Sequence, residues 1–275
     1  MIKIVTDSTV YLKKEMAEKL GVEIVPCVFV SDGNHYSEGY SDCNEDYIDL
    51  MMKSKSNSTS HPNPEVYTKI FRKIIQNGDK IIHISMSSRL SGGFSSASIA
   101  AKNFNPEDIE VFDSMMIAGS LQLVVESARR LIDSGVEFNK ITKALTQTVA
   151  GISTVFTVND ISALRKSGRI GFVRESVGNI LNLKPVLNLK DGRVFSIGNV
   201  QGENKLISRL VEYISPNTKE VIISSMKNSK TANALYYTIK NKFPRMIIKL
   251  QKFGPVLGVH IGEGAVGIAF TKKQG

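Results

Sequence analysis

Apolar positions in the first half of the chain switch repeatedly between a strand pattern and a helix pattern. Residues 2–6 form a short apolar run, after which Leu12, Met16 and Leu20 recur at four-residue spacing, as on one face of a helix. Further strands are predicted at residues 22–30, 80–85 and 109–112, and further helices at 43–53, at 66–74, in the small-residue segment after Gly93, and at 116–133. The polar residues 54–64 are expected to lie outside the core. This alternation predicts an α/β domain with a mainly parallel sheet.

The pattern changes near Gly151, where more closely spaced strands begin. Two β runs, 184–189 and 193–197, are joined by Asp191-Gly192, which is typical of a hairpin turn. The other elements predicted here are strands at 152–158, 220–225 and 246–251 and helices at 160–166, 203–214 and 230–242. We therefore predict two domains, an N-terminal α/β domain (1–150) and a mixed α/β domain (151–275). The crevice between them is the expected ligand site.

Length and composition narrow the class of protein. A chain of 275 residues is long for a single core, which supports two domains. No stretch approaches the roughly 18 apolar residues of a membrane span, and the first residues do not resemble a signal region. The cysteines, Cys27 and Cys43, are expected to be buried or half-buried free thiols in a reducing compartment. A cytoplasmic protein without a stable membrane anchor is expected.

The net charge of +9 is concentrated near the C-terminus. From Lys219 onward, ten Lys and Arg residues face only Glu220 and Glu263. These basic residues form no continuous run, have no interleaved aromatic residues and accompany no nucleic-acid-binding motif. A solvated lysine-rich face is therefore the favoured interpretation, with no nucleic-acid partner. Binding to nucleic acid or to another acidic surface remains the minor alternative, and it predicts an affinity that falls steeply with salt.

Common catalytic motifs are absent from the sequence. It has no phosphate-binding Gly-x-x-x-x-Gly-Lys-Ser/Thr loop, no His-Glu-x-x-His, no Gly-x-Ser-x-Gly and no Cys-x-x-Cys. The four histidines are too scattered to suggest a metal site. Residues 262–267 match Gly-x-Gly-x-x-Gly, but the residues after Gly267 have a strand pattern and leave no room for a following helix and ribose-binding acid. No metal and no nucleotide cofactor are expected.

Two aspartates suggest the main enzymatic alternative. Asp7 and Asp113 each end a predicted strand, where open α/β sheets bind ligands, and each precedes a serine. The pair could serve a hydrolase or a phosphoryl-transfer enzyme. Capping of the following helix is the favoured interpretation, because Asp and Ser side chains accept hydrogen bonds from the first N–H groups of a helix.

Other segments fit an anion. Residues 85–93 place hydroxyls and glycines between a strand and a helix, where backbone N–H groups and the helix dipole attract negative charge. A second hydroxyl cluster, residues 58–64, contains two prolines. His260 lies in an apolar, glycine-rich segment, and Arg169 lies between Gly168 and Gly171. A core histidine and a helix-capping arginine are the alternatives. Together these segments suggest several donors that converge on one carboxylate.

The same segments, in the same order, resemble the DegV family over almost the whole chain. The residues that carry the resemblance are Ile4-Val5-Thr6-Asp7-Ser8-Thr9, Thr59-Ser60-His61-Pro62, Ser87-Ser88-Arg89-Leu90-Ser91-Gly92, Phe112-Asp113-Ser114, Leu164-Arg165-Lys166-Ser167-Gly168-Arg169-Ile170, Leu183-Lys184-Pro185-Val186-Leu187 and Gly254-Pro255 with His260. No single segment is specific, but the set is. The resemblance implies the two-domain DegV fold.

The resemblance also implies a function and a site. DegV proteins are fatty-acid-binding carriers, and the best understood of them present the bound fatty acid to a separate ATP-dependent kinase that phosphorylates the carboxylate. Thr59 and Ser91 would hydrogen-bond the carboxylate, with His260 and Arg169 beside them in its polar network. The acyl tail would occupy an apolar tunnel that we expect to be lined mainly by the first domain. Such a carrier has no catalytic activity of its own and needs no cofactor besides its lipid.

The sequence departs from the usual family pattern at four positions. Arg89 replaces a common Gly, Gly93 a common Thr or Ser, His61 a frequent Gln, and Glu263 the Pro of the typical His-x-Gly-Pro-Gly. Arg89 and Glu263 could alter the specificity for the head group or for the partner. None of these differences removes Thr59, Ser91 or His260.

Overall fold

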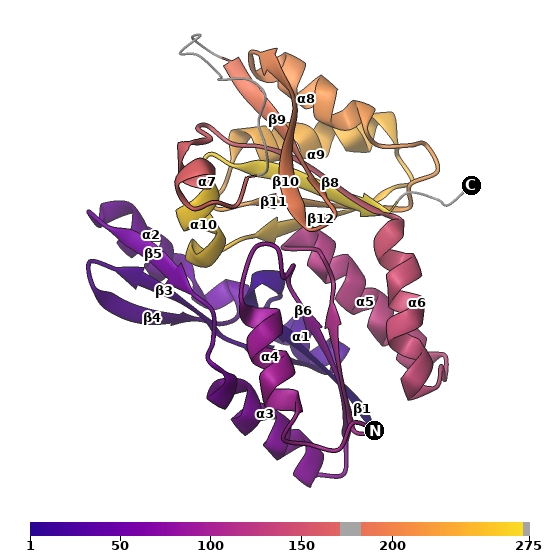
Figure 1. The fold of residues 1–275 in the computed structure, drawn as a ribbon. Coiled ribbons are helices and arrows are strands. Elements are labelled where there is room, and N and C mark those ends of the chain that lie inside the picture. Colours follow the sequence, from indigo (N-terminus) through magenta and orange to yellow (C-terminus); the bar gives the residue numbers. More distant parts are fainter. Residues whose placement is uncertain (171–182, 272–275) are drawn as a thin grey trace.

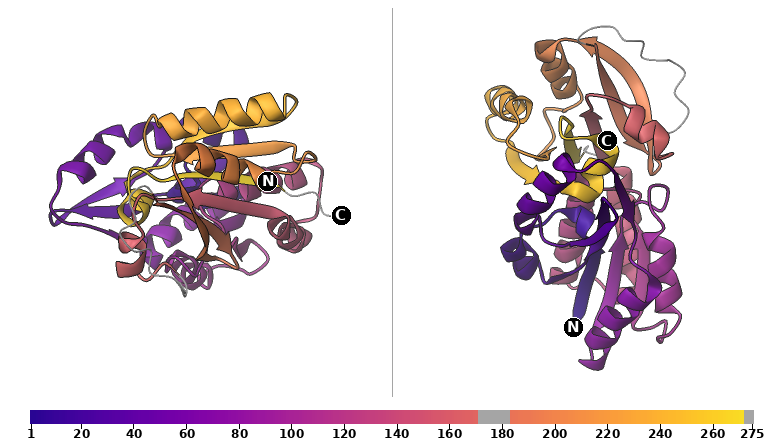
Figure 2. Two further views of the ribbon diagram at one scale, coloured as in Figure 1. Left: turned by 90° about the horizontal axis from the view of Figure 1, so that it is seen from above. Right: turned by 90° about the vertical axis from the view of Figure 1, so that its left-hand side faces the viewer.

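The computed structural model describes residues 1–170 and 183–271, which form three β-sheets with helices packed around and between them (Figure 1). Sheet A has four strands, sheet C has six, and the smaller sheet B has three. The right-hand view of Figure 2 shows sheet A in the lower part of the molecule and sheet C in the upper part. The predicted α/β class, with one parallel and one mixed sheet, is confirmed.

Sheet A is parallel throughout and has helices on both faces. In spatial order its strands are β2 (Val22–Val25), β1 (Ile2–Asp7), β6 (Lys80–Ser85) and β7 (Ile109–Asp113). The helices of this part are η1 (Ser8–Val10, a 3₁₀ helix), α1 (Lys14–Leu20), α3 (Pro64–Gln76), α4 (Gly93–Ala101), α5 (Gly119–Asp133) and α6 (Phe138–Ala150). On β1, Val5 joins a core cluster with Tyr67 and Phe71 of α3, whereas the adjacent Ile4 joins one with Leu121 of α5. Burial on both faces explains the continuous apolar runs in these strands.

Sheet B is antiparallel and was not predicted from the sequence. In spatial order its strands are β4 (Asn34–Glu38), β3 (Cys27–Ser31) and β5 (Asn57–Ser60). Between β4 and β5 the chain forms η2 (Ser41–Cys43, a 3₁₀ helix) and α2 (Glu45–Lys53). The single strand predicted at 22–30 is wrong, because Pro26 lacks an N–H and separates β2 of sheet A from β3 of sheet B. The polar segment 54–64 contains β5, whose Thr59 pairs with Phe29 of β3 through the backbone.

Sheet C is mixed: β11 pairs with β12 in parallel, and the other pairings between its described strands are antiparallel. In spatial order its strands are β10 (Arg193–Gln201), β9 (Leu183–Lys190), β8 (Ile152–Thr157), β13 (Val266–Thr271), β11 (Glu220–Ser225) and β12 (Ile247–Lys252). Its helices are α7 (Ser162–Lys166), α8 (Glu203–Glu212), α9 (Lys230–Lys242) and α10 (Pro255–Ile261). The predicted hairpin is confirmed: its turn residues Asp191 and Gly192 have φ of 48° and 74°, a backbone conformation that favours glycine.

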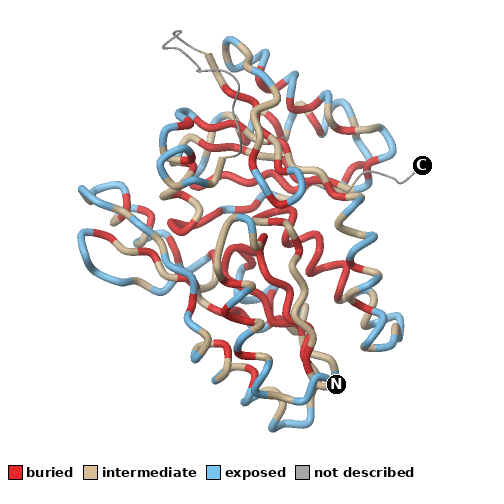
Figure 3. The backbone as a smooth tube through the Cα atoms, in the orientation of Figure 1, coloured by how far each residue is buried: buried red, intermediate tan, exposed pale blue. Residues whose placement is uncertain are grey.

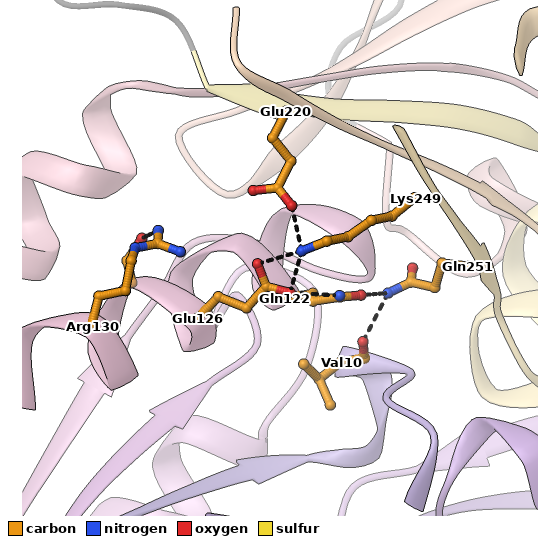
Figure 4. Close-up of polar contacts among 8 residues, drawn as sticks. Val10, Gln122, Glu126, Arg130, Glu220, Lys249 and Gln251 are labelled. Carbon is orange, nitrogen blue, oxygen red and sulfur yellow. Dashed lines mark hydrogen bonds and ion pairs between the residues drawn. The ribbon is translucent and has the colours of Figure 1, made fainter. Parts of the chain in front are cut away.

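Helix α5 joins the two large sheets. It packs against β1 of sheet A and against β8, β11 and β13 of sheet C. Figure 4 shows the polar contacts at this junction. Lys249 of β12 forms ion pairs with Glu126 of α5 and with Glu220 of β11. Gln251 of β12 donates to the backbone carbonyl of Val10 at 3.0 Å. These contacts connect the first half of the chain to the outer strand of sheet C.

The largest core cluster crosses residue 150. It contains Ile82 of β6 and Leu121 of α5 as well as Ile222 of β11 and Ala269 of β13. Figure 3 shows buried residues where the upper and lower parts meet. The cluster that includes Leu235 of α9 is separate and lies within sheet C and its helices. The division into domains 1–150 and 151–275 stays a prediction.

The thiols and the helix lengths test two further expectations. Cys27 is buried and Cys43 is exposed, and both are free. The prediction of a buried or half-buried thiol is therefore wrong for Cys43, which lies in η2 on the surface of the sheet B region. Across residues 1–170 and 183–271, none of the helices combines the length and apolar character that a membrane crossing requires.

Candidate ligand site

Strand β5 and helix α10 bring Thr59 and His260 together. The Thr59 hydroxyl oxygen lies 2.8 Å from Nε2 of His260, although the two residues are 201 positions apart. Helix α10 was not predicted, because its segment is rich in glycine. It begins with Pro255, whose fixed φ suits the first position of a helix, and it carries His260 in its last turn. The pairing of β5 with β3 holds Thr59 opposite this turn.

Ser91 and Arg169 lie on the neighbouring loops. The Ser91 hydroxyl accepts a hydrogen bond from Gly93 N–H, the first residue of α4, at 3.3 Å. Arg169 Nε donates to the carbonyl of Leu90, the residue before Ser91, at 3.3 Å, and its Nη1 donates to the carbonyl of Ser167. These bonds place the guanidinium beside the loop that precedes α4. Gly171, the second glycine expected to flank Arg169, lies outside the described residues.

All four predicted site residues line one cavity. About 1140 Å³ of space lies within the cavity and the open solvent at its mouth. Its remaining lining is mainly apolar and includes Met86, Ile117, Phe156, Leu189, Val194 and Leu257. Most of the described lining residues follow residue 150, so the expectation of a tunnel formed mainly by the first domain is wrong. The reason is that α10 and five strands of sheet C, namely β8, β9, β10, β11 and β13, contribute residues to the cavity wall.

Among the described lining residues, Arg169 carries a positive charge, whereas His260 is neutral near pH 7. Burial and, secondarily, the positive charge of Arg169 lower the pKa of His260 to about 4. His260 is therefore neutral near pH 7, with one ring nitrogen that donates and one that accepts. The N-terminus of α4 adds the positive end of a helix dipole close to Ser91. The described part of the cavity thus provides hydrogen-bond donors and the Arg169 cation for a single anionic group.

Two further lining residues were not singled out by sequence reasoning as site residues. His61 follows β5, and its ring occupies the space into which a side chain at Gly92 would project, with Cε1 2.6 Å from the ideal Cβ position. Cys27 of β3 also lines the cavity. Burial is the main cause that raises the pKa of its thiol, and Asp7 adds to this. His61 lies in a motif that the sequence highlighted, whereas nothing in the sequence marks Cys27.

Asp7 and Asp113 organise the backbone and do not line the cavity. Asp7 is buried, caps η1 by accepting Thr9 N–H, and also accepts Met86 N–H at 2.8 Å. Asp113 accepts N–H groups from Ser88 and Met115. The capping prediction is thus confirmed for Asp7, although the helix is a single 3₁₀ turn. It is wrong for Asp113, because α5 begins six residues later.

The sequence also raised a metal site, a dinucleotide-binding motif and two residues, Arg89 and Glu263, that differ from the usual DegV pattern. Within the described ranges, no group of three or more His, Cys, Asp or Glu residues could hold a metal ion. The residues after Gly267 lie in strand β13 (Val266–Thr271), as predicted, and not in the helix that a dinucleotide motif requires. Arg89 and Glu263 are exposed, and the Arg89 stem lies against the hairpin turn at Gly192.

Comparison with known proteins establishes the family. Residues 1–273 match the family model described as "Uncharacterised protein, DegV family". The chain belongs to the DegV family. A DegV domain-containing protein of Clostridium acetobutylicum is 30% identical, and the match covers 99% of each chain. The DegV fold expected from the sequence is thereby confirmed.

Solved DegV structures resemble the chain over its full length. A DegV family protein from Thermus thermophilus, described for its fatty acid binding, has 26% identity and a TM-score of 0.88 over 98% of this chain and 99% of its own. A stearic acid-binding protein from Eubacterium ventriosum has 26% identity and a TM-score of 0.87 over 99% of each chain. DegV from Bacillus subtilis, a fatty acid binding protein, has 26% identity and a TM-score of 0.86.

Proposed function

We propose that this DegV protein binds one long-chain fatty acid, with the carboxylate at Thr59, Ser91, Arg169 and His260 and the acyl tail in the apolar part of the cavity. The observation that carries the proposal is the mainly apolar cavity in which these four polar side chains gather. Ligand pockets with apolar walls and a few convergent polar groups orient one end of an apolar molecule. The fatty acid binding of the relatives from Thermus thermophilus and Bacillus subtilis supports the same ligand class.

The energetics favour this division of labour. Burial of the tail of a sixteen-carbon fatty acid at about 0.8 kcal/mol per methylene gives about 12 kcal/mol before the entropy costs of binding. The head group must then be paired, because a buried carboxylate without partners is costly. Arg169 supplies the opposite charge. When Nε2–H of His260 donates to the Thr59 oxygen, the Thr59 hydroxyl hydrogen remains free for the carboxylate.

The carrier role is the second part of the proposal. The chain presents its bound carboxylate to a separate ATP-dependent fatty acid kinase and catalyses no reaction itself. The resemblance of the site segments to DegV carriers supports this role, as does the absence of a phosphate-binding loop from the sequence. The kinase supplies the nucleotide, so the carrier needs no cofactor other than its lipid. The carrier acts in the cytoplasm without a membrane anchor.

Lipid extraction tests the binding part first. The purified protein is denatured, extracted with organic solvent and analysed by mass spectrometry, with the native mass as a check on stoichiometry. One fatty acid per chain is the expected result. If the extract is empty and added palmitate and oleate also fail to bind, the proposal is wrong.

A double variant tests the carboxylate site. Thr59→Ala with Ser91→Ala should weaken fatty acid retention by at least tenfold, because two hydrogen bonds to a charged group are lost. The matched control is Thr68→Ala with Ser98→Ala. These hydroxyls donate to backbone carbonyls within α3 and α4 and do not line the cavity. Equal retention in both double variants would show that the carboxylate lies elsewhere.

A further inference from the structure

The helix that carries His260 begins at two buried side chains from the start of the chain. Pro255, the first residue of α10, has no N–H, and the next two N–H groups have no partner within the helix. Val256 N–H donates to Glu38 Oε2 at 2.8 Å. Leu257 N–H donates to the hydroxyl oxygen of Tyr11 at 3.1 Å. Glu38 and Tyr11 therefore satisfy the beginning of α10.

These two side chains belong to one closed cluster. Glu38 is 0% exposed and Tyr11 is 2% exposed. The Ser8 hydroxyl donates to Glu38 Oε1 at 3.4 Å, and the carboxyl of Glu38 lies close enough to Tyr11 to contribute to the raised pKa of the phenol. Gly254 permits the close approach, because a Cβ at this position would lie 2.3 Å from Glu38 Oε2. The contact between the Glu38 carboxyl and α10 thus requires glycine at 254.

A displacement at the beginning of α10 would reach the cavity. The helix has seven residues, about 10 Å at 1.5 Å per residue, and His260 is the sixth of them. At that end, the 2.8 Å contact with Thr59 depends on where the helix lies. Neither Glu38 nor Tyr11 lines the cavity, so neither can contact a ligand there directly.

We propose that Glu38 and Tyr11 are positioning residues, which fix the His260 imidazole against Thr59 by holding the first N–H groups of α10. The effect of this placement on affinity for an anionic head group rests on the proposed function, whereas the placement of His260 itself does not. The two residues control affinity for the head group without touching it.

The charge state of Glu38 defines a conservative variant. Burial is the main cause that raises the pKa of Glu38 to about 8, so the carboxyl is mostly protonated near pH 7. Asp7 of β1, Tyr11 after η1 and Cys27 of β3 are the ionisable groups that face it. A glutamine side chain has the same shape as the protonated acid. It can accept from Val256 N–H and donate toward Ser8.

The experiment compares four variants in the full chain. Glu38→Ala and Tyr11→Phe each remove one acceptor from α10, whereas Glu38→Gln keeps it. Tyr67→Phe is the control for loss of a buried tyrosine hydroxyl, because that hydroxyl has no hydrogen-bond partner among the described residues. The first measurement is the NMR titration of His260 in delipidated protein, assigned with His260→Gln. The second is the rate at which bound oleate transfers to fatty-acid-free serum albumin.

Displacement of α10 should expose His260 and so change both measurements. In Glu38→Ala and Tyr11→Phe the pKa of His260 should rise from about 4 toward its ordinary value, and oleate should dissociate about 5- to 10-fold faster. Glu38→Gln and Tyr67→Phe should resemble the wild type in both. If Glu38→Ala and Tyr11→Phe fold and the pKa of His260 in both equals that in the wild type, the proposal is overturned. If Glu38→Ala does not fold, Tyr11→Phe decides.

The two proposals fail differently. If the wild-type protein binds no oleate, the carrier proposal is wrong, and the His260 titration alone then supports or overturns the positioning role. Oleate could instead dissociate at the same rate from all four variants while the pKa of His260 rises in Glu38→Ala and Tyr11→Phe. That result would support the positioning of His260 by Glu38 and Tyr11 and overturn their control of head-group affinity.

Discussion

Replacement of Glu38 by glutamine should change how the stability of the protein depends on pH. In the folded protein, burial raises the pKa of Glu38 from its ordinary value of 4.5 to about 8. Between these two values the folded chain holds a proton that the unfolded chain has lost. The stability that this proton provides is complete below pH 4.5 and is lost as the pH rises toward 8. Glutamine does not titrate, so this loss should be absent from Glu38→Gln.

The magnitude follows from the two pKa values. Each pH unit of separation corresponds to about 1.4 kcal/mol, so the full effect approaches about 5 kcal/mol above pH 8. Between pH 5 and pH 8, the wild type should lose about 3 to 4 kcal/mol relative to Glu38→Gln. The buried histidines have the opposite effect on stability, which they increase as the pH rises. Burial lowers the pKa of His83 to about 3 and, together with the charge of Arg169, lowers the pKa of His260 to about 4. Both proteins share these histidines, so their effect cancels in the difference.

Urea denaturation at pH 5, 6, 7 and 8, followed by circular dichroism, measures this difference. The chain has no tryptophan, so circular dichroism is preferred to tryptophan fluorescence. Glu45→Gln is the control, because Glu45 is exposed and its Lys252 partner lowers its pKa. Its difference from the wild type should stay constant over this range. If the free energies of unfolding of the wild type and of Glu38→Gln change in parallel between pH 5 and pH 8, the inference that burial raises the pKa of Glu38 is wrong.

Three further predictions concern the site, a close backbone approach and a helix cap. His260→Ala should impair transfer of the acyl carboxylate to the kinase more than it impairs fatty acid binding; equal losses in a phosphorylation assay and a binding assay would refute this division. Gly267→Ala should destabilise the protein by about 1 to 3 kcal/mol in urea denaturation, because the new Cβ would lie 2.8 Å from Cβ of Phe156 in the paired strand. Ser229→Ala should cost about 1 kcal/mol, because the Ser229 hydroxyl accepts Ala232 N–H at the beginning of α9, and an unchanged midpoint would count against the cap.

Regular apolar patterns made the large sheets predictable. Strands β6 and β11 and helix α9 have the predicted bounds, because each buries a clear apolar run or face. Sheet B was missed for the opposite reason. The residues of β5 are polar, and the backbone pairs of β3 with β4 and β5 leave no such pattern. Helix α10 was hidden by its glycines, and α6 was not predicted.

The candidate site was predicted in part. Thr59, Ser91, Arg169 and His260 came from the family resemblance, and each lines the cavity. Their role as carboxylate ligands stays a prediction. Nothing in the sequence indicated Glu38, because the other residues of its strand are polar and exposed or half-buried. Its burial results from the packing of α10, more than 200 residues later, against sheet B.

The sequence by itself determined the alternation of strands and helices, the parallel sheet A, the mixed sheet C and membership of the DegV family. These features depend on local patterns and on short segments whose order is preserved. Only the tertiary structure decided that sheet B and α10 meet, that the cavity is closed largely by the second half of the chain, and that Glu38 is buried. The physical reason is that burial and pKa depend on contacts between residues far apart in the chain, which a local pattern does not contain.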